Sequence, residues 1–297
     1  MKIAVSGSSG FIGSALLPEL VAEGHQVLRL ARTTGPAPAS TVRWNPVTGM
    51  VDRKQFEGVE AVIHLAGAPV ACTWTPASKA LIRDSRVLGT RQLVENLVGL
   101  SSRPRVLLCA SAIGYYGNRG HQLLNENSPA GSGFLAEVCA EWEGVTELAA
   151  TAGIRVVRMR LGAVLSPYGG ILRRMLPIFR WGLGGPVGDG RQFMSWISMK
   201  DTIKAIQFLL GKDSIRGPVN LVSPQPVTNR EFSKTLGRAL SRPAFFPFPA
   251  FAVNLFFGEM GRELLLSSAQ VEPNRLKEAG FVFQHPVLGH ALEEMAI

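Results

Sequence analysis

The chain of 297 residues has few cysteines and no cluster of metal-ligand residues. Its three cysteines, Cys72, Cys109 and Cys139, lie far apart and form no Cys-x-x-Cys pair. This argues against a disulfide framework and favours a reducing compartment, with Cys109 as a small core residue. The five histidines show no ligand spacing, so we predict no metal site.

Long apolar segments are also missing. The most apolar stretch, Phe245–Phe257, is too short to span a bilayer and contains Pro247 and Pro249. The chain enters a strand pattern at Lys2, without the apolar region of a signal peptide before it. These absences predict a cytoplasmic protein with no membrane partner.

Positive charge is in excess but is not clustered. Thirty-one Lys and Arg residues against 22 Asp and Glu give a net charge of +9. Because no Lys/Arg run and no alternation of basic and aromatic residues occurs, we expect no nucleic-acid partner. The excess is interpreted as solvated surface together with a phosphate site.

The first half of the chain alternates short β-branched segments with longer helical patterns, which predicts a parallel sheet with crossover helices. The predicted strands are Lys2–Ser6, Gln26–Leu30, Thr41–Trp44, Ala61–Leu65, Val106–Ala110 and Arg155–Arg160. The predicted helices are Phe11–Glu23, Pro76–Leu97 and Phe134–Ala152. We expect an α/β fold, a Rossmann doubly wound parallel sheet, over residues 1–165.

After Leu165 the pattern loosens into Gly-rich turns and apolar segments, with a helix over Thr202–Leu210. We expect residues 166–297 to form a smaller C-terminal lobe for the substrate or a lid, from which a late strand at residues 219–222 returns to the sheet. Within this lobe, Phe245–Phe257 suits either a lid over a hydrophobic substrate or a partner interface.

The sequence "VSGSSGFIG" places three glycines between the first strand and the first helix. Gly7 allows a tight turn, Gly10 lets the backbone approach a pyrophosphate, and Gly13 lets the helix pack closely on the sheet. The helix N-terminus then offers free N–H groups to the phosphates. The predicted cofactor-binding residues of this turn are Gly7, Ser9, Gly10, Phe11, Ile12 and Gly13.

The end of the second strand bears on which dinucleotide binds. A carboxylate about 20 residues after the glycines holds the ribose of NAD, whereas Arg favours the 2′-phosphate of NADP. The strand ends in "LRLARTT", with Arg32 at its tip and no Asp or Glu between Arg29 and Thr41. We therefore predict NADP(H); the alternative is that Arg32 is only a solvated loop residue.

Several further motifs carry a resemblance to a known superfamily. They are "HLAG" (His64–Gly67), "VLGT" (Val87–Thr90), "YYG" (Tyr115–Gly117), "RLGAVLSP" (Arg160–Pro167) and "GDGRQFMSWISMKD" (Gly188–Asp201). With the glycine turn, they resemble the extended short-chain dehydrogenase/reductases. The segments "SAIGYYG", "CAEWE", "GGILRRMLP", "GLGGPVGDGRQ" and "LKEAGFVF" are similar to the atypical branch called epimerase family proteins. The resemblance covers nearly the whole chain.

The resemblance implies further positions around a cofactor. Leu65, Ala66 and Gly67 are expected to pass beside the cofactor, and the residues expected near the nicotinamide are Leu161, Gly162 and Val164. It also implies a possible homodimer through the helices that bear "VLGT" and "AEWE".

The usual catalysts of the superfamily are missing. By resemblance, its Ser/Thr, Tyr and Lys fall on Ala112, Phe134 and Val138. None of these side chains can donate a proton, so the usual mechanism cannot operate. As replacement acids we consider Ser111, Tyr115 and Tyr116, for each of which the alternative is a structural hydrogen bond.

The segment expected to bind the substrate also differs from that of the superfamily. Met194 stands where relatives place the Arg that pairs with a nucleotide-sugar diphosphate, and Ser195 replaces the following Asp. Arg191 lies three residues earlier, on the opposite face of a strand. A nucleotide-sugar epimerase is therefore less favoured.

Arg86 stands where the superfamily usually has Asn in this helix. It could be a partner of Asp84 or a surface contact, or it could be an anchor for a substrate or cofactor phosphate.

Other polar residues near these motifs are expected to be structural. We expect Glu137, Glu141 and Glu143 on a helix surface, Trp142 in the core, and His64 as a hydrogen-bonded core histidine.

Two functions remain open. The first is an NADPH-dependent oxidoreductase that acts on a small carbonyl or activated alkene with a non-standard proton donor or solvent. The second is a non-catalytic NADP(H)-binding redox sensor or partner-binding protein. The sequence does not identify the small-molecule substrate.

Overall fold

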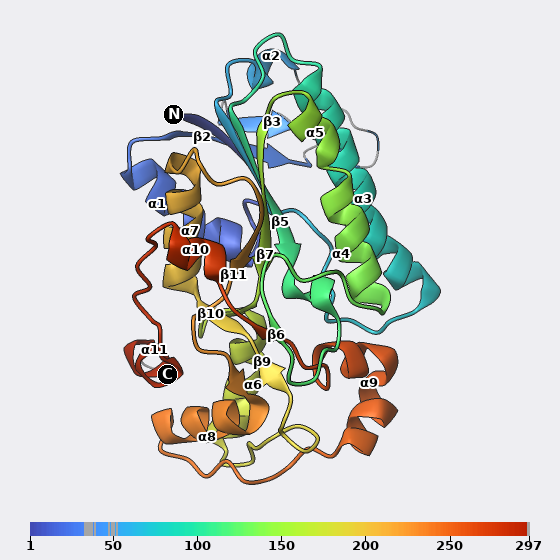
Figure 1. Cartoon of the computed structure of the whole chain (residues 1–297), viewed down its shortest axis with the longest axis vertical. Coiled ribbons are helices and arrows are strands. Elements are labelled where there is room, and N and C mark those ends of the chain that lie inside the picture. The colour runs from blue at the N-terminus through green and yellow to red at the C-terminus, as the bar shows by residue number, and fades with distance from the viewer. Residues whose placement is uncertain (33–37, 39, 47, 49–50, 52, 296–297) are drawn as a thin grey trace.

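The structure, a computed structural model, describes residues 1–32, 38, 40–46, 48, 51 and 53–295. A parallel sheet of seven strands in the order β11-β7-β5-β4-β1-β2-β3 forms the centre of the larger lobe (Figure 1). The strands are β1 (Lys2–Ser6), β2 (Gln26–Ala31), β3 (Thr41–Arg43), β4 (Ala61–His64), β5 (Val106–Ala112), β7 (Arg155–Leu161) and β11 (Gly217–Leu221). The order reverses at β1, which confirms the predicted doubly wound Rossmann fold.

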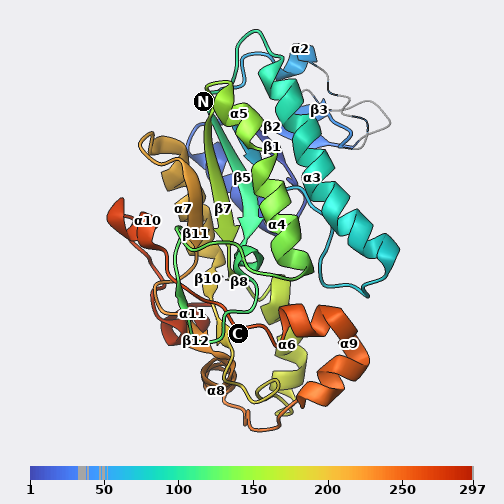
Figure 2. The same ribbon diagram turned by 45° about the vertical axis from the view of Figure 1, so that its right-hand side comes forward.

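Helices cover both faces of this sheet. On one face lie α1 (Phe11–Ala22) and α7 (Met199–Gly211), and on the other lie α3 (Pro76–Val98), α4 (Phe134–Gly144) and α5 (Glu147–Thr151) (Figures 1 and 2). Successive residues of β1 point to opposite faces, so Ile3 packs with the α1 side and Ala4 with the α3 side. The central strands β1, β4 and β5 are mostly apolar and buried because both faces of the sheet are covered there.

The last strand of the sheet comes from a part of the chain that is otherwise in the smaller lobe. β11 pairs with β7 in parallel, Val219 opposite Met159, which confirms the predicted late strand. The smaller lobe contains α6 (Gly170–Arg180), α8 (Asn229–Ala239), α9 (Ala250–Leu264) and α11 (Leu288–Glu294), all in the lower part of Figure 1. Its own apolar cluster is centred on Trp196 and Phe232.

Short elements join the two lobes. The two-stranded pairs are β8 (Ala163–Leu165) with β10 (Trp196–Ser198), β9 (Phe193–Met194) with β12 (Val227–Thr228), and β6 (Leu123–Leu124) with β13 (Gln270–Val271). The remaining short helices are α2 (Arg53–Phe56), η1 (Ile113–Tyr116) and α10 (Asn274–Glu278).

One predicted helix is divided. The predicted continuous helix Phe134–Ala152 was wrong, because α4 ends at Gly144 and α5 begins at Glu147. The hydroxyl of Thr146 donates to the carbonyl of Glu143 at 2.7 Å. Such a local side-chain bond competes with the regular helical pattern.

No helix in the described part of the chain is both long enough and apolar enough to cross a bilayer.

Candidate functional site

The carboxyl ends of the parallel strands meet at one edge of the sheet, where α/β proteins bind their ligands. The glycine turn follows β1, Arg32 follows β2 and is exposed, Leu65–Gly67 follows β4, and Leu161–Val164 continues from β7. β4 and β2 flank β1 on either side, so these segments surround the point where the strand order reverses.

The glycine turn is packed directly against the segment after β4. Gly7 has φ +67°, and a Cβ there would lie 2.7 Å from the carbonyl carbon of Leu65 and 2.8 Å from the nitrogen of Ala66. A Cβ on Gly13 would lie 2.2 Å from the oxygen of Gly7. Side chains are thus excluded at both positions for steric reasons.

The start of α1 is open to an anion. Gly10 is exposed and supplies no side-chain cap, and the first turn of α1 contains no acidic residue. The first N–H groups of the helix therefore keep their positive potential for an external acceptor. This arrangement fits the pyrophosphate of a dinucleotide.

A series of hydrogen bonds between buried side chains connects β1, β4, α3 and α4 near the turn. The imidazole of His64 contacts Ser6 Oγ at 2.6 Å and Thr90 Oγ1 at 2.9 Å, and Trp142 Nε1 donates to Thr90 Oγ1 at 2.8 Å. Burial lowers the pKa of His64 to about 4, so the ring is neutral at pH 7. The predicted core roles of His64 and Trp142 are confirmed.

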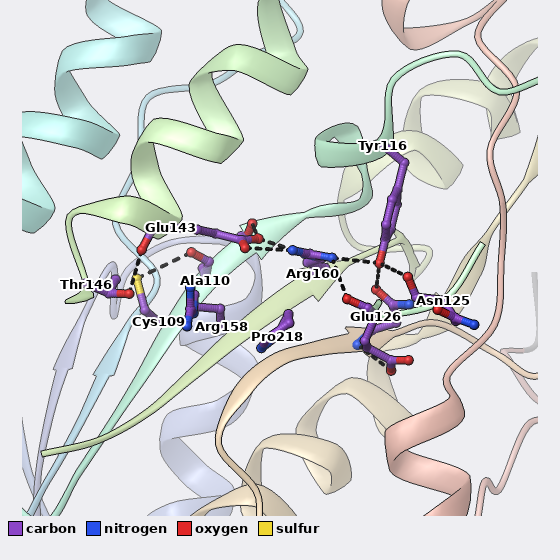
Figure 3. A network of polar contacts seen from close by, with 12 residues as sticks. Cys109, Ala110, Tyr116, Asn125, Glu126, Glu143, Thr146, Arg158, Arg160 and Pro218 are labelled. Atoms are coloured by element: carbon purple, nitrogen blue, oxygen red, sulfur yellow. Dashed lines mark hydrogen bonds and ion pairs between the residues drawn. The ribbon is translucent and has the colours of Figure 1, made fainter. Parts of the chain in front are cut away.

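A second buried network lies beside the end of β5 (Figure 3). Arg160 Nε and Nη2 donate to the two carboxylate oxygens of Glu143, each at 2.8 Å. The predicted surface position of Glu143 was wrong, since its side chain is buried. It turns toward β7, where the Arg160 guanidinium compensates its charge.

This network includes two of the three candidate acids. Ser111 is buried and its hydroxyl donates to Glu143 Oε1 at 2.7 Å. Tyr116 is buried, donates to Asn220 Oδ1 at 2.7 Å and accepts from Arg160 Nη1 at 2.9 Å (Figure 3). Burial raises the pKa of Tyr116 to about 12. Both hydroxyls are thus held in structural bonds.

Tyr115 differs from the other two candidates. Its ring lies against the guanidinium of Arg160, with 3.5 Å from Cζ to the ring centroid. The side chain is half-buried, and its hydroxyl has no hydrogen-bond partner among the residues that the structure describes. Arg160 therefore fixes the ring while the phenol stays available.

Apolar side chains occupy the positions of the missing Tyr and Lys. Val138 is buried, and the Phe134 ring meets Trp74 edge to face at 5.0 Å between centroids. The ammonium of Lys79, from α3, lies 4.5 Å from the Phe134 centroid and pairs with Glu259 of α9 at 2.8 Å. Sequence reasoning missed Lys79, because its position is separated from α4 in the chain and no motif marks it.

At the expected substrate end, Ser195 is held in structural hydrogen bonds. Ser195 is buried, donates to the carbonyl of Ala269 and accepts from the N–H of Val271. Met194 is half-buried, and Arg191 is exposed. Val164, expected near the nicotinamide, lies in β8 with its side chain in the core.

Of the alternatives considered for Arg86, the pair with Asp84 does not form among the described residues. Arg86 is half-buried, donates through Nη1 to the carbonyl of Ile82 at 3.0 Å, and faces the Trp142 ring at 5.3 Å. Its guanidinium points toward Gly67, since a Cβ built there would lie 3.2 Å from Arg86 Cζ.

Fold and glycine turn together define a nucleotide-binding protein of the Rossmann class. The model of the NAD dependent epimerase/dehydratase family matches residues 3–221, and a domain of unknown function, DUF1731, matches residues 248–295. The chain belongs to the NAD dependent epimerase/dehydratase family.

Individual proteins agree with this assignment. An epimerase family protein of Mycobacterium bovis is 45% identical over 291 residues, covering 98% of this chain and 96% of its own. The structure of human epimerase family protein SDR39U1 with NADPH has a TM-score of 0.90 and 32% identity, covering 100% of this chain and 99% of that chain. A Corynebacterium glutamicum structure, described as a nucleoside-diphosphate sugar epimerase, has a TM-score of 0.83 and 32% identity, covering 100% of this chain and 58% of that chain.

Proposed function

We propose that the protein binds NADPH and reduces a small carbonyl or activated alkene. The observation that carries the cofactor is the open N-terminus of α1 after the glycine turn, with Arg32 at the end of the neighbouring strand β2. The human relative, similar over the whole chain, was solved with NADPH, which supports the same cofactor here. Bound NADPH would supply the hydride.

Residues of the chain itself then bind the cofactor and protonate the substrate. The turn at Gly7–Gly13 holds the pyrophosphate, and Arg32 forms a charge-assisted bond with the 2′-phosphate. Tyr115 donates the proton to the reduced substrate, because its phenol is the one of the three candidate hydroxyls without a structural bond and its ring is fixed by Arg160.

The wall formed by the half-buried rings of Phe134 and Trp74 favours a substrate with an apolar part. Phe134 takes the place of the usual catalytic phenol, and the Lys79 ammonium over its ring is paired with Glu259. A substrate with a hydrophobic body and one polarised double bond fits such a wall better than a nucleotide sugar.

The test is NADPH consumption across a panel of aldehydes, ketones and enones, followed at 25 °C with the purified full chain. We expect turnover with an apolar member of the panel and a large loss of kcat in Tyr115→Phe. Arg32→Ala should weaken NADPH binding much more than NADH binding. Firm NADPH binding without turnover on any compound would refute the oxidoreductase, and equal losses for both cofactors would refute the role of Arg32.

One observation favours the second candidate, a redox sensor that binds a partner. Large apolar side chains are exposed along α9 and the segment before it: Phe245, Phe246, Phe248, Phe251, Leu255, Phe256 and Phe257. Exposed apolar surface of this extent is typical of interaction sites. The absence of turnover, together with an NADPH-dependent change in the exposure of these rings to a hydrophobic dye, would favour the sensor.

A further inference from the structure

Arg86 is a cation inside the binding edge that no motif of the family explains. It lies on α3, and its guanidinium is close to the backbone of Gly67, at the end of β4. The neighbouring hydroxyl of Ser85 accepts from the N–H of Ala68 at 3.0 Å, so α3 holds the same loop by a second contact. The loop and the guanidinium are therefore fixed relative to each other.

The charge of this guanidinium is not compensated. It contacts the carbonyl of Ile82 and the face of Trp142, and among the described residues no carboxylate lies within ion-pair distance of it. Burial lowers the pKa of Arg86. A desolvated cation with five N–H donors and one carbonyl acceptor is costly unless an anion completes its bonds.

The position of Arg86 relative to the phosphate turn indicates which anion it would bind. Gly67 directly follows Leu65 and Ala66, whose backbone is in contact with Gly7 of the phosphate turn. Arg32 lies on the β2 side of β1, whereas Arg86 lies on the β4 side. A dinucleotide crosses this point of reversal, so a 2′-phosphate at Arg32 places the adenosine half over β2 and the nicotinamide half over β4.

We propose that Arg86 binds the phosphate of the nicotinamide mononucleotide half of NADPH. This assignment rests on the proposed function and adds a second anionic contact to it, at the opposite end of the pyrophosphate from Arg32. Guanidinium suits this task because it bonds phosphate oxygens through two parallel donors. Asp84 and Ser85, its neighbours on α3, cannot replace it.

The experiment compares two ligands by calorimetric titration of the full chain. NADPH contains both halves of the cofactor, whereas 2′,5′-ADP contains only the adenosine half. Arg86→Met removes the charge and keeps the apolar stem, and Arg86→Lys keeps a charge without the fork. The matched control is Arg83→Met, one turn earlier on α3, where the arginine is exposed and pairs with Glu141 at 2.7 Å.

We expect Arg86→Met to weaken NADPH by about 10- to 100-fold, the range of a lost charge-assisted bond. Its affinity for 2′,5′-ADP should stay within about twofold of wild type, which also shows that the variant is folded. The NADPH affinity of Arg86→Lys should lie between those of wild type and Arg86→Met. Arg83→Met should bind both ligands with wild-type affinity.

Two results would overturn the assignment. One is an unchanged NADPH affinity in Arg86→Met. The other is that Arg86→Met and Arg86→Lys each lose as much affinity for 2′,5′-ADP as for NADPH. If Arg86→Met fails to fold, Arg86→Lys decides the question by the same comparison. Wild-type protein that binds neither ligand would refute the proposed function itself, which separates the failure of the cofactor site from the failure of Arg86.

Discussion

The Arg160–Glu143 pair is buried, and its energetic role can be measured. The side chains are 3% and 6% exposed, and both bonds of the fork measure 2.8 Å. Removing one partner leaves the other charged, buried and unpaired, which costs about 3–5 kcal/mol in such sites. Against a total stability of about 5–15 kcal/mol, Arg160→Met or Glu143→Leu should therefore lower the free energy of unfolding by a large fraction.

The double variant is the sharper test. Replacing both charges with apolar groups removes the uncompensated ion, so its cost should be smaller than the sum of the single costs by about 2 kcal/mol or more. Wild type, the two single variants and the double variant form a double-mutant cycle, and urea denaturation measures the free energy of unfolding of each. Additive single costs would refute the reasoning, because they would mean that the two charges do not stabilise each other.

Arg83 and Glu141 provide the control for this cycle. They form a similar fork, with donor–acceptor distances of 2.8 and 3.0 Å, but they are 55% and 40% exposed. Solvent screens an exposed pair, so each single replacement there should cost no more than about 1 kcal/mol. The comparison isolates burial, since both pairs use α4 and the same bidentate geometry.

Three further predictions concern the core, the turn and the cap of α4. His64 has its pKa lowered by burial from 6.5 to about 4, so the unfolded state takes up the proton first on acidification. The free energy of unfolding should then fall between these pH values by about 3 kcal/mol, and an unchanged acid dependence in His64→Gln would contradict this. Gly7→Ala should abolish NADPH binding because its Cβ meets backbone, whereas Gly24→Ala, with φ +78° and nothing within 4 Å, should cost only about 1–2 kcal/mol of stability and bind NADPH as wild type. Glu263→Gln should cost about 1 kcal/mol and speed amide hydrogen exchange at Phe134, whose N–H donates to that carboxylate at 2.8 Å; unchanged exchange would disprove the cap.

The features that the sequence predicted well are local or repeated. Strands such as Ala61–His64 are buried along their length because both faces of the sheet are covered, and the structure places this strand within one residue of the predicted Ala61–Leu65. The turn at Gly7–Gly13 was predictable because backbone geometry alone demands glycine there. The predicted core position of Trp142 was also correct.

The missed features depend on partners far apart in the chain. Nothing in "CAEWEGV" separates Glu143 from Glu141, but one faces Arg160 of β7 and the other faces Arg83 on the surface. The division between α4 and α5 falls at Thr146, whose hydroxyl donates to the carbonyl of Glu143, and helical periodicity does not encode this bond. Arg86 was recognised as unusual, but only the fold shows that it faces Gly67 and not Asp84.

The carboxylate of Glu263 has a consequence for how the chain unfolds. It belongs to residues 248–295, yet it accepts from the N–H groups of Phe134 and Leu135 at the beginning of α4. In the same segment Glu259 pairs with Lys79 of α3. These contacts link the two regions matched by separate family models, and we expect calorimetry to record a single melting transition. A chain limited to residues 3–221 would lack this carboxylate, so we expect the beginning of α4 to be less stable in it by about 1 kcal/mol.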